Sequence, residues 1–208
     1  VCVELAPGAK KVYKDAKIIL QSECYMLESI EDNEKWGRYT FLGYDPKLEL
    51  TCTDGRLTVK NGTSMVFETK HPGEYIRQIV KENKSPRIEW LPTFTGGLVG
   101  YFSYDYMKYA EPALKLTAKD EEGFKDVDLM LFDNVIDYDH FRQKLILIVN
   151  IRCENLETEY HKAEVELETM RRLLSDGEMA PLEPGRCTSG FRALFDKERY
   201  CSVVEKAK

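Results

Sequence analysis

Two glycine dipeptides constrain the fold of this chain more than any other feature. Asp54-Gly55 and Asn61-Gly62 are pairs that two-residue β-hairpin turns prefer, because such turns need backbone with positive φ. Strand-forming residues flank both turns, with apolar side chains at alternate positions. The pattern predicts an antiparallel meander with strands at residues 39–43, 47–52, 56–60 and 64–68. One face of this meander is expected to consist of Leu48, Leu50, Leu57 and Val59.

The rest of the chain adds helices and further strands. Pro72 and the apolar spacing that follows predict a helix over residues 72–82. Strand-like runs come next at residues 128–139 and 144–150, and the second is apolar enough to indicate a central strand buried on both faces. A helix is predicted over residues 157–174, with one buried face made of Tyr160, Ala163, Leu167, Met170 and Leu174. The expected class is α+β, with sandwich-like antiparallel sheets and flanking helices.

The C-terminal part is expected to contain a linker and the start of a second domain. Gly177 is the predicted helix stop, and the prolines and glycines of residues 175–192 are typical of a linker. Asp196 can cap a new helix, whose apolar stripe is still running at Lys208. That stripe consists of Tyr200, Val203, Val204 and Ala207. We therefore expect one domain at 1–192 and a truncated start of another at 193–208.

A glycine-rich run interrupts the strand-like segment 91–109. Gly96, Gly97 and Gly100 lie among Thr, Phe, Leu, Val and Tyr residues, and glycine inside a strand usually marks a bulge or a close approach of backbone or ligand. The spacing fits neither a P-loop nor a dinucleotide fingerprint. A bent and buried core strand is the preferred interpretation, and direct ligand contact is the alternative.

Composition excludes several functional classes. The net charge is −6 and the basic residues are scattered, which argues against a nucleic-acid surface. No apolar run is long enough to cross a membrane, and no signal peptide is evident, so a cytoplasmic protein is expected. The six cysteines are dispersed and only three histidines are present, so we expect free thiols and no metal site in this chain.

No catalytic residue is assigned from spacing alone. Asp133, Asp137 and Asp139 fall at period-two positions of one predicted strand, where they would share a face and could act as an acid–base pair. Aspartates of strand edges and turns are the preferred interpretation. Asp126 and Asp128 lie just upstream of them. The serines 29 and 103 have no neighbouring histidine in the sequence to activate them.

Four segments together resemble the N-terminal half of the large subunit (component I) of the anthranilate synthase family, which uses chorismate. They are Met26-Leu-Glu-Ser29, Trp36-Gly-Arg-Tyr-Thr-Phe-Leu-Gly43, Phe94-Thr-Gly-Gly-Leu-Val-Gly-Tyr-Phe-Ser-Tyr-Asp105 and Asp128-Leu-Met-Leu-Phe-Asp133. The glycine-rich segment is shared with the related aminodeoxychorismate synthase, whereas the Leu-Glu-Ser and Arg-Tyr-Thr-Phe-Leu segments look more like the anthranilate enzyme. The resemblance spans residues 24–208.

The resemblance implies a regulatory role for this part of the chain. In the family, the Leu-Glu-Ser segment lines the pocket in which tryptophan binds as a feedback inhibitor, so Leu27, Glu28 and Ser29 are the matching residues. A carboxylate can pair with the ligand ammonium, and a hydroxyl can bind the zwitterion. Arg38 is the nearest match to a basic pocket residue. The alternatives are an ordinary strand end for Glu28 and Ser29, and a surface cation over an aromatic ring for Arg38.

The resemblance also implies what the longer protein does. Full-length members convert chorismate and ammonia, supplied by a glutamine amidotransferase subunit, into anthranilate and pyruvate with Mg²⁺. Their catalytic and magnesium-binding residues lie in the later half, so residues 1–192 would be the tryptophan-binding domain and 193–208 the start of the chorismate-binding domain. This chain alone is then expected to be inactive. The alternatives are aminodeoxychorismate synthase component I of folate biosynthesis and a freestanding amino-acid-binding domain. Self-association of the chain is also possible.

Overall fold

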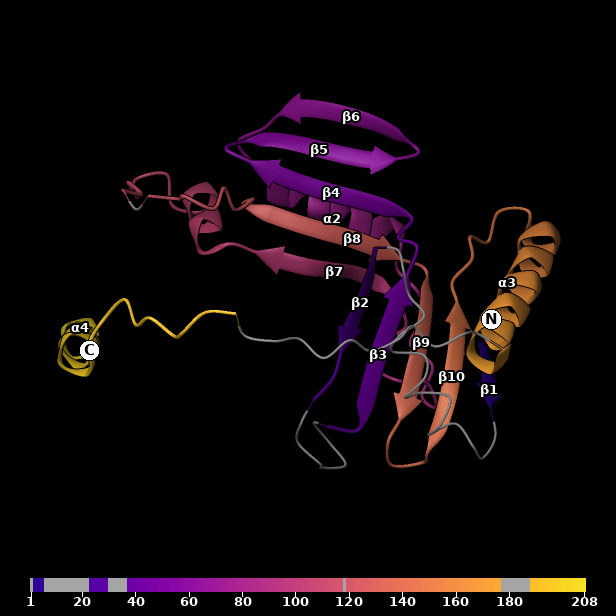
Figure 1. Ribbon diagram of the computed structural model, residues 1–208. Coiled ribbons are helices and arrows are strands. Elements are labelled where there is room, and N and C mark those ends of the chain that lie inside the picture. The colour runs from indigo at the N-terminus through magenta and orange to yellow at the C-terminus, as the bar shows by residue number, and fades with distance from the viewer. Residues whose placement is uncertain (1, 6–22, 30–36, 118, 177–187) are drawn as a thin grey trace.

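The computed structural model describes residues 2–5, 23–29, 37–117, 119–176 and 188–208. They form two five-stranded antiparallel sheets whose strands run in different directions (Figure 1). Sheet A has the order β1 (Cys2–Leu5), β10 (Lys144–Val149), β9 (Asn134–Asp139), β3 (Tyr39–Tyr44) and β2 (Cys24–Leu27). Sheet B has the order β6 (Thr63–Glu68), β5 (Arg56–Asn61), β4 (Leu48–Thr53), β8 (Val127–Phe132) and β7 (Gly97–Phe102). The predicted α+β class, with antiparallel sheets and flanking helices, is confirmed.

The meander predicted from the glycine dipeptides consists of β4, β5 and β6. The prediction is wrong for its first strand, residues 39–43, because this strand is β3 of sheet A, where it pairs with β2 and β9. Asp54 and Gly55 have φ of 50° and 82°, and Gly62 has φ of 68°, so the turns use the positive φ that these residues tolerate. The pairs Thr53↔Arg56 and Asn61↔Thr63 close the two hairpins. The first has the predicted two-residue turn, whereas in the second Asn61 belongs to β5 and Gly62 alone separates the paired residues. Leu50 and Leu57 are buried in one cluster, and Leu48 and Val59 pack against it half-buried. The predicted face is confirmed.

Each sheet packs against its own helix. The helix α2 (Pro72–Glu82), at the predicted bounds, contacts the core of sheet B through Ile76 and Ile79. The helix α3 (Leu156–Asp176) lies against sheet A (Figure 1). The sheets therefore do not stack face to face over one shared core, because these two clusters draw on different strands.

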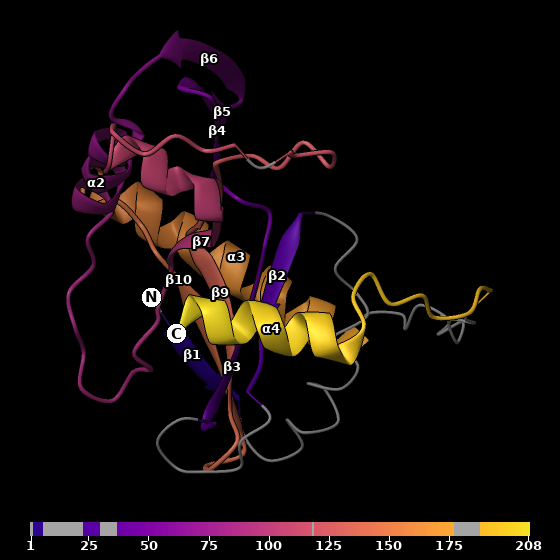
Figure 2. The same cartoon turned by 90° about the vertical axis from the view of Figure 1, so that its left-hand side faces the viewer.

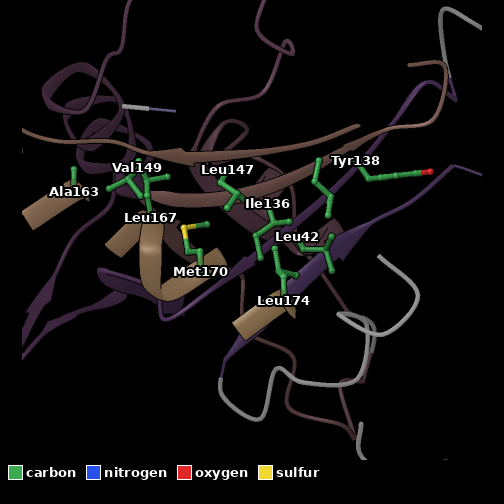
Figure 3. Close-up of a cluster of buried hydrophobic side chains, with 10 residues drawn as sticks. Leu42, Ile136, Tyr138, Leu147, Val149, Ala163, Leu167, Met170 and Leu174 are labelled. Carbon is green, nitrogen blue, oxygen red and sulfur yellow. The ribbon is translucent and has the colours of Figure 1, made fainter. Parts of the chain in front are cut away.

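The buried face of α3 is nearly the predicted one. Ala163, Leu167, Met170 and Leu174 are buried against Leu42, Ile136 and Leu147 of sheet A (Figure 3). Tyr160 is wrong as a core residue, because its side chain is 45% exposed at the first turns of the helix. The central position predicted for the apolar strand is confirmed by β10, which lies between β1 and β9 with residues 145–149 buried.

The single run predicted at residues 128–139 is two strands in different sheets. Asp133 separates β8 from β9, and its carbonyl oxygen accepts hydrogen bonds from the backbone and side-chain amides of Asn150. The chain leaves sheet B at this residue and enters sheet A. The predicted strand face shared by Asp133, Asp137 and Asp139 is therefore wrong for Asp133.

The glycine-rich strand is extended and closely packed, but it is not a core strand. β7 lies at the edge of sheet B, and its second half is exposed. Gly100 has φ of 153°, and a Cβ there would lie 1.9 Å from the carbonyl oxygen of Asp128. The expected close approach of another backbone is thus present, while the expected burial is wrong. Residues Tyr104–Tyr109 form a 3₁₀ helix, η1, and not a continued strand.

The C-terminal helix α4 (Lys197–Ala207) is capped as predicted. The Asp196 carboxylate accepts a hydrogen bond from the Arg199 amide at 2.7 Å. Figure 1 shows α4 beyond an extended segment and apart from both sheets, and in Figure 2, which looks from that side, α4 lies in front of sheet A. Its apolar stripe is exposed. The predicted linker, residues 175–192, is described only in part. Residues 175 and 176 belong to α3, and residues 177–187, with the predicted helix stop Gly177, lie outside the described residues.

Candidate functional site

The four residues expected to bind an effector lie at one end of sheet A. Leu27 is the last residue of β2 and is paired with Phe41 of β3, and Glu28 and Ser29 follow it directly. Arg38 immediately precedes β3, which runs antiparallel to β2. The structure therefore brings Leu27, Glu28 and Ser29 to the same end as Arg38. Leu27, Glu28 and Ser29 are exposed there, and Arg38 is half-buried.

Arg38 forms a two-pronged ion pair with the carboxylate that ends β9. Its Nε donates to Asp139 Oδ1 at 3.1 Å and its Nη2 donates to Asp139 Oδ2 at 2.6 Å. The guanidinium carbon also lies 4.7 Å from the ring centre of Tyr39 and 5.6 Å from that of Phe141. The cation-over-aromatic interpretation is confirmed for Tyr39. Arg38 therefore orders this end of the sheet, and a contact with an effector is an additional proposal.

The Asp139 carboxylate also holds the turn between β9 and β10. Its Oδ1 accepts hydrogen bonds from the amides of Phe141 and Arg142 at 3.1 and 3.0 Å, while the His140 amide donates to the Arg38 carbonyl at 2.8 Å. Burial pushes the pKa of Asp139 upward, but the hydrogen bonds from Arg38 and these amides outweigh it and lower the pKa below its ordinary value. Asp139 is thus a buried, ionised anchor.

A second buried carboxyl lies on the same face of the sheet as Leu27. Leu27, Phe41, Asp137 and Ile146 are in register across β2, β3, β9 and β10, so their side chains share the face opposite α3. Asp137 is fully buried, and among the described residues neither carboxylate oxygen has a hydrogen-bond partner. Burial first, and the charge of Asp139 second, raise the pKa of Asp137 to about 8.

Tyr25 completes this buried polar group. Its ring crosses Gly43, where a Cβ would lie only 2.2 Å from Tyr25 Cε1, and it makes edge contacts with Phe132 and Phe94 at centroid distances of 4.7 and 6.2 Å. Its hydroxyl is buried without a partner among the described residues. Burial, and then the charge of Asp137, raise the pKa of this phenol. Sequence reasoning missed Tyr25, because only the strand register reveals its glycine neighbour.

The other candidate carboxylates are engaged in structural contacts. Asp133 is paired with Lys47 where the two sheets meet, and Asp128 is paired with Lys125 at 2.7 Å. Asp126 accepts from Lys108 at 2.8 Å and from the Tyr109 hydroxyl at 2.7 Å. The three aspartates suggested as an acid–base group are therefore not together. Asp133 lies where the two sheets meet, whereas Asp137 and Asp139 are buried residues of β9 in sheet A.

The described residues contain no group of three or more histidine, cysteine or acidic side chains placed to hold a metal ion. Four cysteines, Cys24, Cys52, Cys153 and Cys201, are free thiols as expected. Within the described part of the chain, no helix has both the length and the apolar character needed to cross a membrane.

Comparisons with known proteins agree with the resemblance seen in the sequence. The chain is 34% identical over 193 residues to anthranilate synthase component 1 of Acinetobacter calcoaceticus, covering 90% of this chain and 38% of that protein. It is 29% identical over 214 residues to aminodeoxychorismate synthase component 1 of Bacillus subtilis, covering 97% of this chain and 44% of that protein. The chain thus spans about two-fifths of the length of these relatives.

A solved structure and a family model give the remaining comparisons. The crystal structure of anthranilate synthase component I from Streptococcus pneumoniae TIGR4 matches with a TM-score of 0.55 and 22% identity, over 98% of this chain and 42% of that one, which shows a shared fold. The family model described as chorismate binding enzyme matches residues 22–208. The chain therefore belongs to the family of chorismate binding enzymes.

Proposed function

We propose that this chain is the N-terminal regulatory part of an anthranilate synthase component I. The observation that carries the proposal is the 34% identity to a component 1 protein over nine-tenths of this chain, together with the Leu27-Glu28-Ser29 segment at an exposed end of sheet A. The full-length protein would convert chorismate and ammonia into anthranilate and pyruvate in the cytoplasm. A glutamine amidotransferase subunit would supply the ammonia.

Catalysis is assigned to the part of the protein beyond these residues. In the family that the chain resembles, the magnesium-binding residues lie in the later half, so we place that ion outside residues 1–192. The 208-residue chain alone is then inactive. Anthranilate fluorescence, followed with chorismate, ammonia and Mg²⁺, tests both statements: the full-length protein is expected to form anthranilate and the 208-residue chain to form none. Turnover by the short chain contradicts the assignment.

Tryptophan is the proposed effector, bound at Leu27, Glu28 and Ser29. Glu28 would pair with the ligand ammonium, the Ser29 hydroxyl would bind its carboxylate, and Leu27 would contact the ring. Arg38 would contribute indirectly, by holding the end of the strand in place, because two of its nitrogens already bind Asp139. Inhibition then requires that tryptophan bind one conformational state of the enzyme better than the other.

Calorimetry of the full-length protein tests the effector site. Ser29→Phe fills the space beside Glu28 and is expected to abolish measurable tryptophan binding while anthranilate formation continues without inhibition. Ser64→Phe is the matched control, because Ser64 is also an exposed serine but lies on β6 in sheet B. Equal tryptophan affinity in the two variants would count against the site.

Aminodeoxychorismate synthase remains the second candidate because a protein of that name is among the relatives, at 29% identity. The two activities differ in product, since the folate-pathway enzyme retains the side chain that anthranilate synthase eliminates as pyruvate. Coupled detection of pyruvate from the full-length protein distinguishes them. Anthranilate synthase releases pyruvate in step with product, whereas aminodeoxychorismate synthase releases none.

A further inference from the structure

We propose that Asp137 is protonated in the folded protein, and that loss of this proton loosens the end of sheet A that carries Leu27–Ser29 and Arg38. The proton site is independent of the proposed function. Its effect on effector binding rests on that function. The site would make this end of the sheet sensitive to mildly alkaline pH.

Burial without partners is the first argument. Asp137 is 0% exposed, and neither of its oxygens has a hydrogen-bond partner in the described part of the chain. Its face of the sheet carries the apolar cluster of Val135, Ile146 and Ile148, with Phe41 beside it on β3 and with Leu91 and Phe94 packed against it. An ionised carboxylate in such surroundings is far more costly than a neutral acid, so the group keeps its proton.

The charged neighbours do not compensate a second negative charge. Asp139 lies two residues along the same strand face, and the Arg38 guanidinium that could neutralise Asp137 is already bound to Asp139 by two hydrogen bonds. Lys144 is in register with Asp139 and not with Asp137. Among the described residues, the phenols of Tyr25 and Tyr39 are also close enough for Asp137 to influence them; both are neutral, and their own pKa values are raised.

These contacts explain how the proton would control the strand end. When Asp137 ionises, two carboxylates on one strand compete for one guanidinium, and water must reach a side chain that is fully buried. Any shift of Arg38 toward Asp137 weakens its hold on Asp139, which anchors the Phe141 and Arg142 amides. The β9–β10 turn and Arg38, which directly precedes β3, are therefore expected to loosen together.

The sign of the pH effect follows from the raised pKa. Asp137 has an ordinary pKa of 3.8 when exposed and about 8 in the fold, so the unfolded chain gives up this proton first. Its contribution to stability is complete below pH 4 and is lost progressively as pH rises to 8. Within that window, the folding equilibrium constant of the wild type is expected to fall about tenfold per pH unit relative to a variant without this group.

The test compares urea unfolding of the full-length wild type, Asp137→Asn and Asp128→Asn between pH 5 and 9. Asp128→Asn is the control, because Asp128 is paired with Lys125 on sheet B. The ratio of the Asp137→Asn folding constant to that of the wild type should rise with pH and level off near 8, and the control should follow the wild type. Parallel profiles for all three proteins overturn the proposal.

Infrared difference spectra of the wild type supply a second readout that does not depend on any variant folding. The carbonyl band of a protonated, buried carboxylic acid should be present at pH 6.5 and disappear by pH 9.5; its absence at pH 6.5 overturns the proposal. Tryptophan affinity measured over the same range should fall in the wild type and stay level in Asp137→Asn. Failure of tryptophan to bind the wild type at any pH overturns the proposed function, while the infrared band still decides the proton site.

Discussion

Arg38 illustrates how one side chain stabilises a sheet end that also carries a candidate binding segment. Its guanidinium joins the residue before β3 to the last residue of β9, and Asp139 is almost completely buried beneath it. Removing one partner of a buried pair leaves the other charge uncompensated, which is more costly than removing both. The two backbone amides bound to Asp139 offset only part of that cost.

We therefore expect Arg38→Met to lower the free energy of unfolding by about 3 kcal/mol. Urea denaturation followed by circular dichroism measures the change. Lys125→Met is the control, because the pair of Lys125 and Asp128 is more exposed and such pairs contribute at most about 1 kcal/mol. Equal losses in the two variants would show that the Arg38 pair contributes no more than a surface pair.

Removal of the Tyr25 hydroxyl is expected to change the stability of the protein in the opposite direction. It is buried without a hydrogen-bond partner in the described part of the chain, so its desolvation is not repaid there. Tyr25→Phe keeps the ring over Gly43 and is expected to stabilise the protein by about 1 kcal/mol. Tyr44→Phe, which loses a 3.1 Å bond to Glu166, should be destabilised by a similar amount. Thermal unfolding of both variants checks the contrast, and a clear loss in Tyr25→Phe would contradict it.

Among the elements, the largest loss of stability is expected from a substitution on the buried face of α3. Met170 is fully buried between the helix and sheet A (Figure 3), whereas Val165 on the outer face of the same helix is 68% exposed. Met170→Ala should cost about 2–5 kcal/mol through lost burial and the cavity left behind. Val165→Ala should change stability by less than about 0.5 kcal/mol. Chemical denaturation of both variants measures this difference, and similar values would mean that α3 does not depend on its buried face.

The elements also show which features of the fold could be predicted from sequence. The β4–β5–β6 meander was predictable because its turn residues act locally through positive φ. The switch from β8 to β9 was not, because apolar residues continue through both strands and one residue, Asp133, carries the chain between sheets. The edge position of β7 was missed for a related reason, since its apolar composition does not reveal a missing neighbour strand.

The candidate site also contains residues that could be predicted from sequence and residues that could not. Residues 27–29 and Arg38 were found from the resemblance to a family, and the strand pairing then placed them at one end of sheet A. The sequence pattern favours a turn or edge position for Asp137, and this prediction is wrong, because the residue is buried in the middle of a sheet. Its environment depends on Phe41 and Phe94, which lie 96 and 43 positions away in sequence, so local patterns carry no signal of it.

At the scale of the whole molecule, the two sheets are held together at a small polar junction. Lys47 precedes β4 and is paired with Asp133, and its amide donates to the Leu131 carbonyl at 2.8 Å. Asn150, just after β10, donates through Nδ2 to the Thr95 carbonyl at 2.6 Å and to the Asp133 carbonyl at 2.9 Å. Gly96 permits this approach, because a Cβ there would lie 2.6 Å from Asn150 Nδ2. Asn150 thus links β7, the β8–β9 break and β10.

Asn150→Ala removes both side-chain bonds and leaves the Thr95 carbonyl without its amide donor. We expect a loss of about 2 kcal/mol, since unsatisfied groups at a partly buried junction cost more than the bonds contribute. Hydrogen exchange should show faster opening at the start of β7 and at the β8–β9 break than in the meander β4–β5–β6. Gln78→Ala removes an exposed side-chain bond to Glu82 on α2 and should leave exchange at the junction unchanged. Uniformly faster exchange across both sheets in Asn150→Ala would instead mean that the sheets unfold as one unit, with Asn150 contributing to global stability and not to their junction.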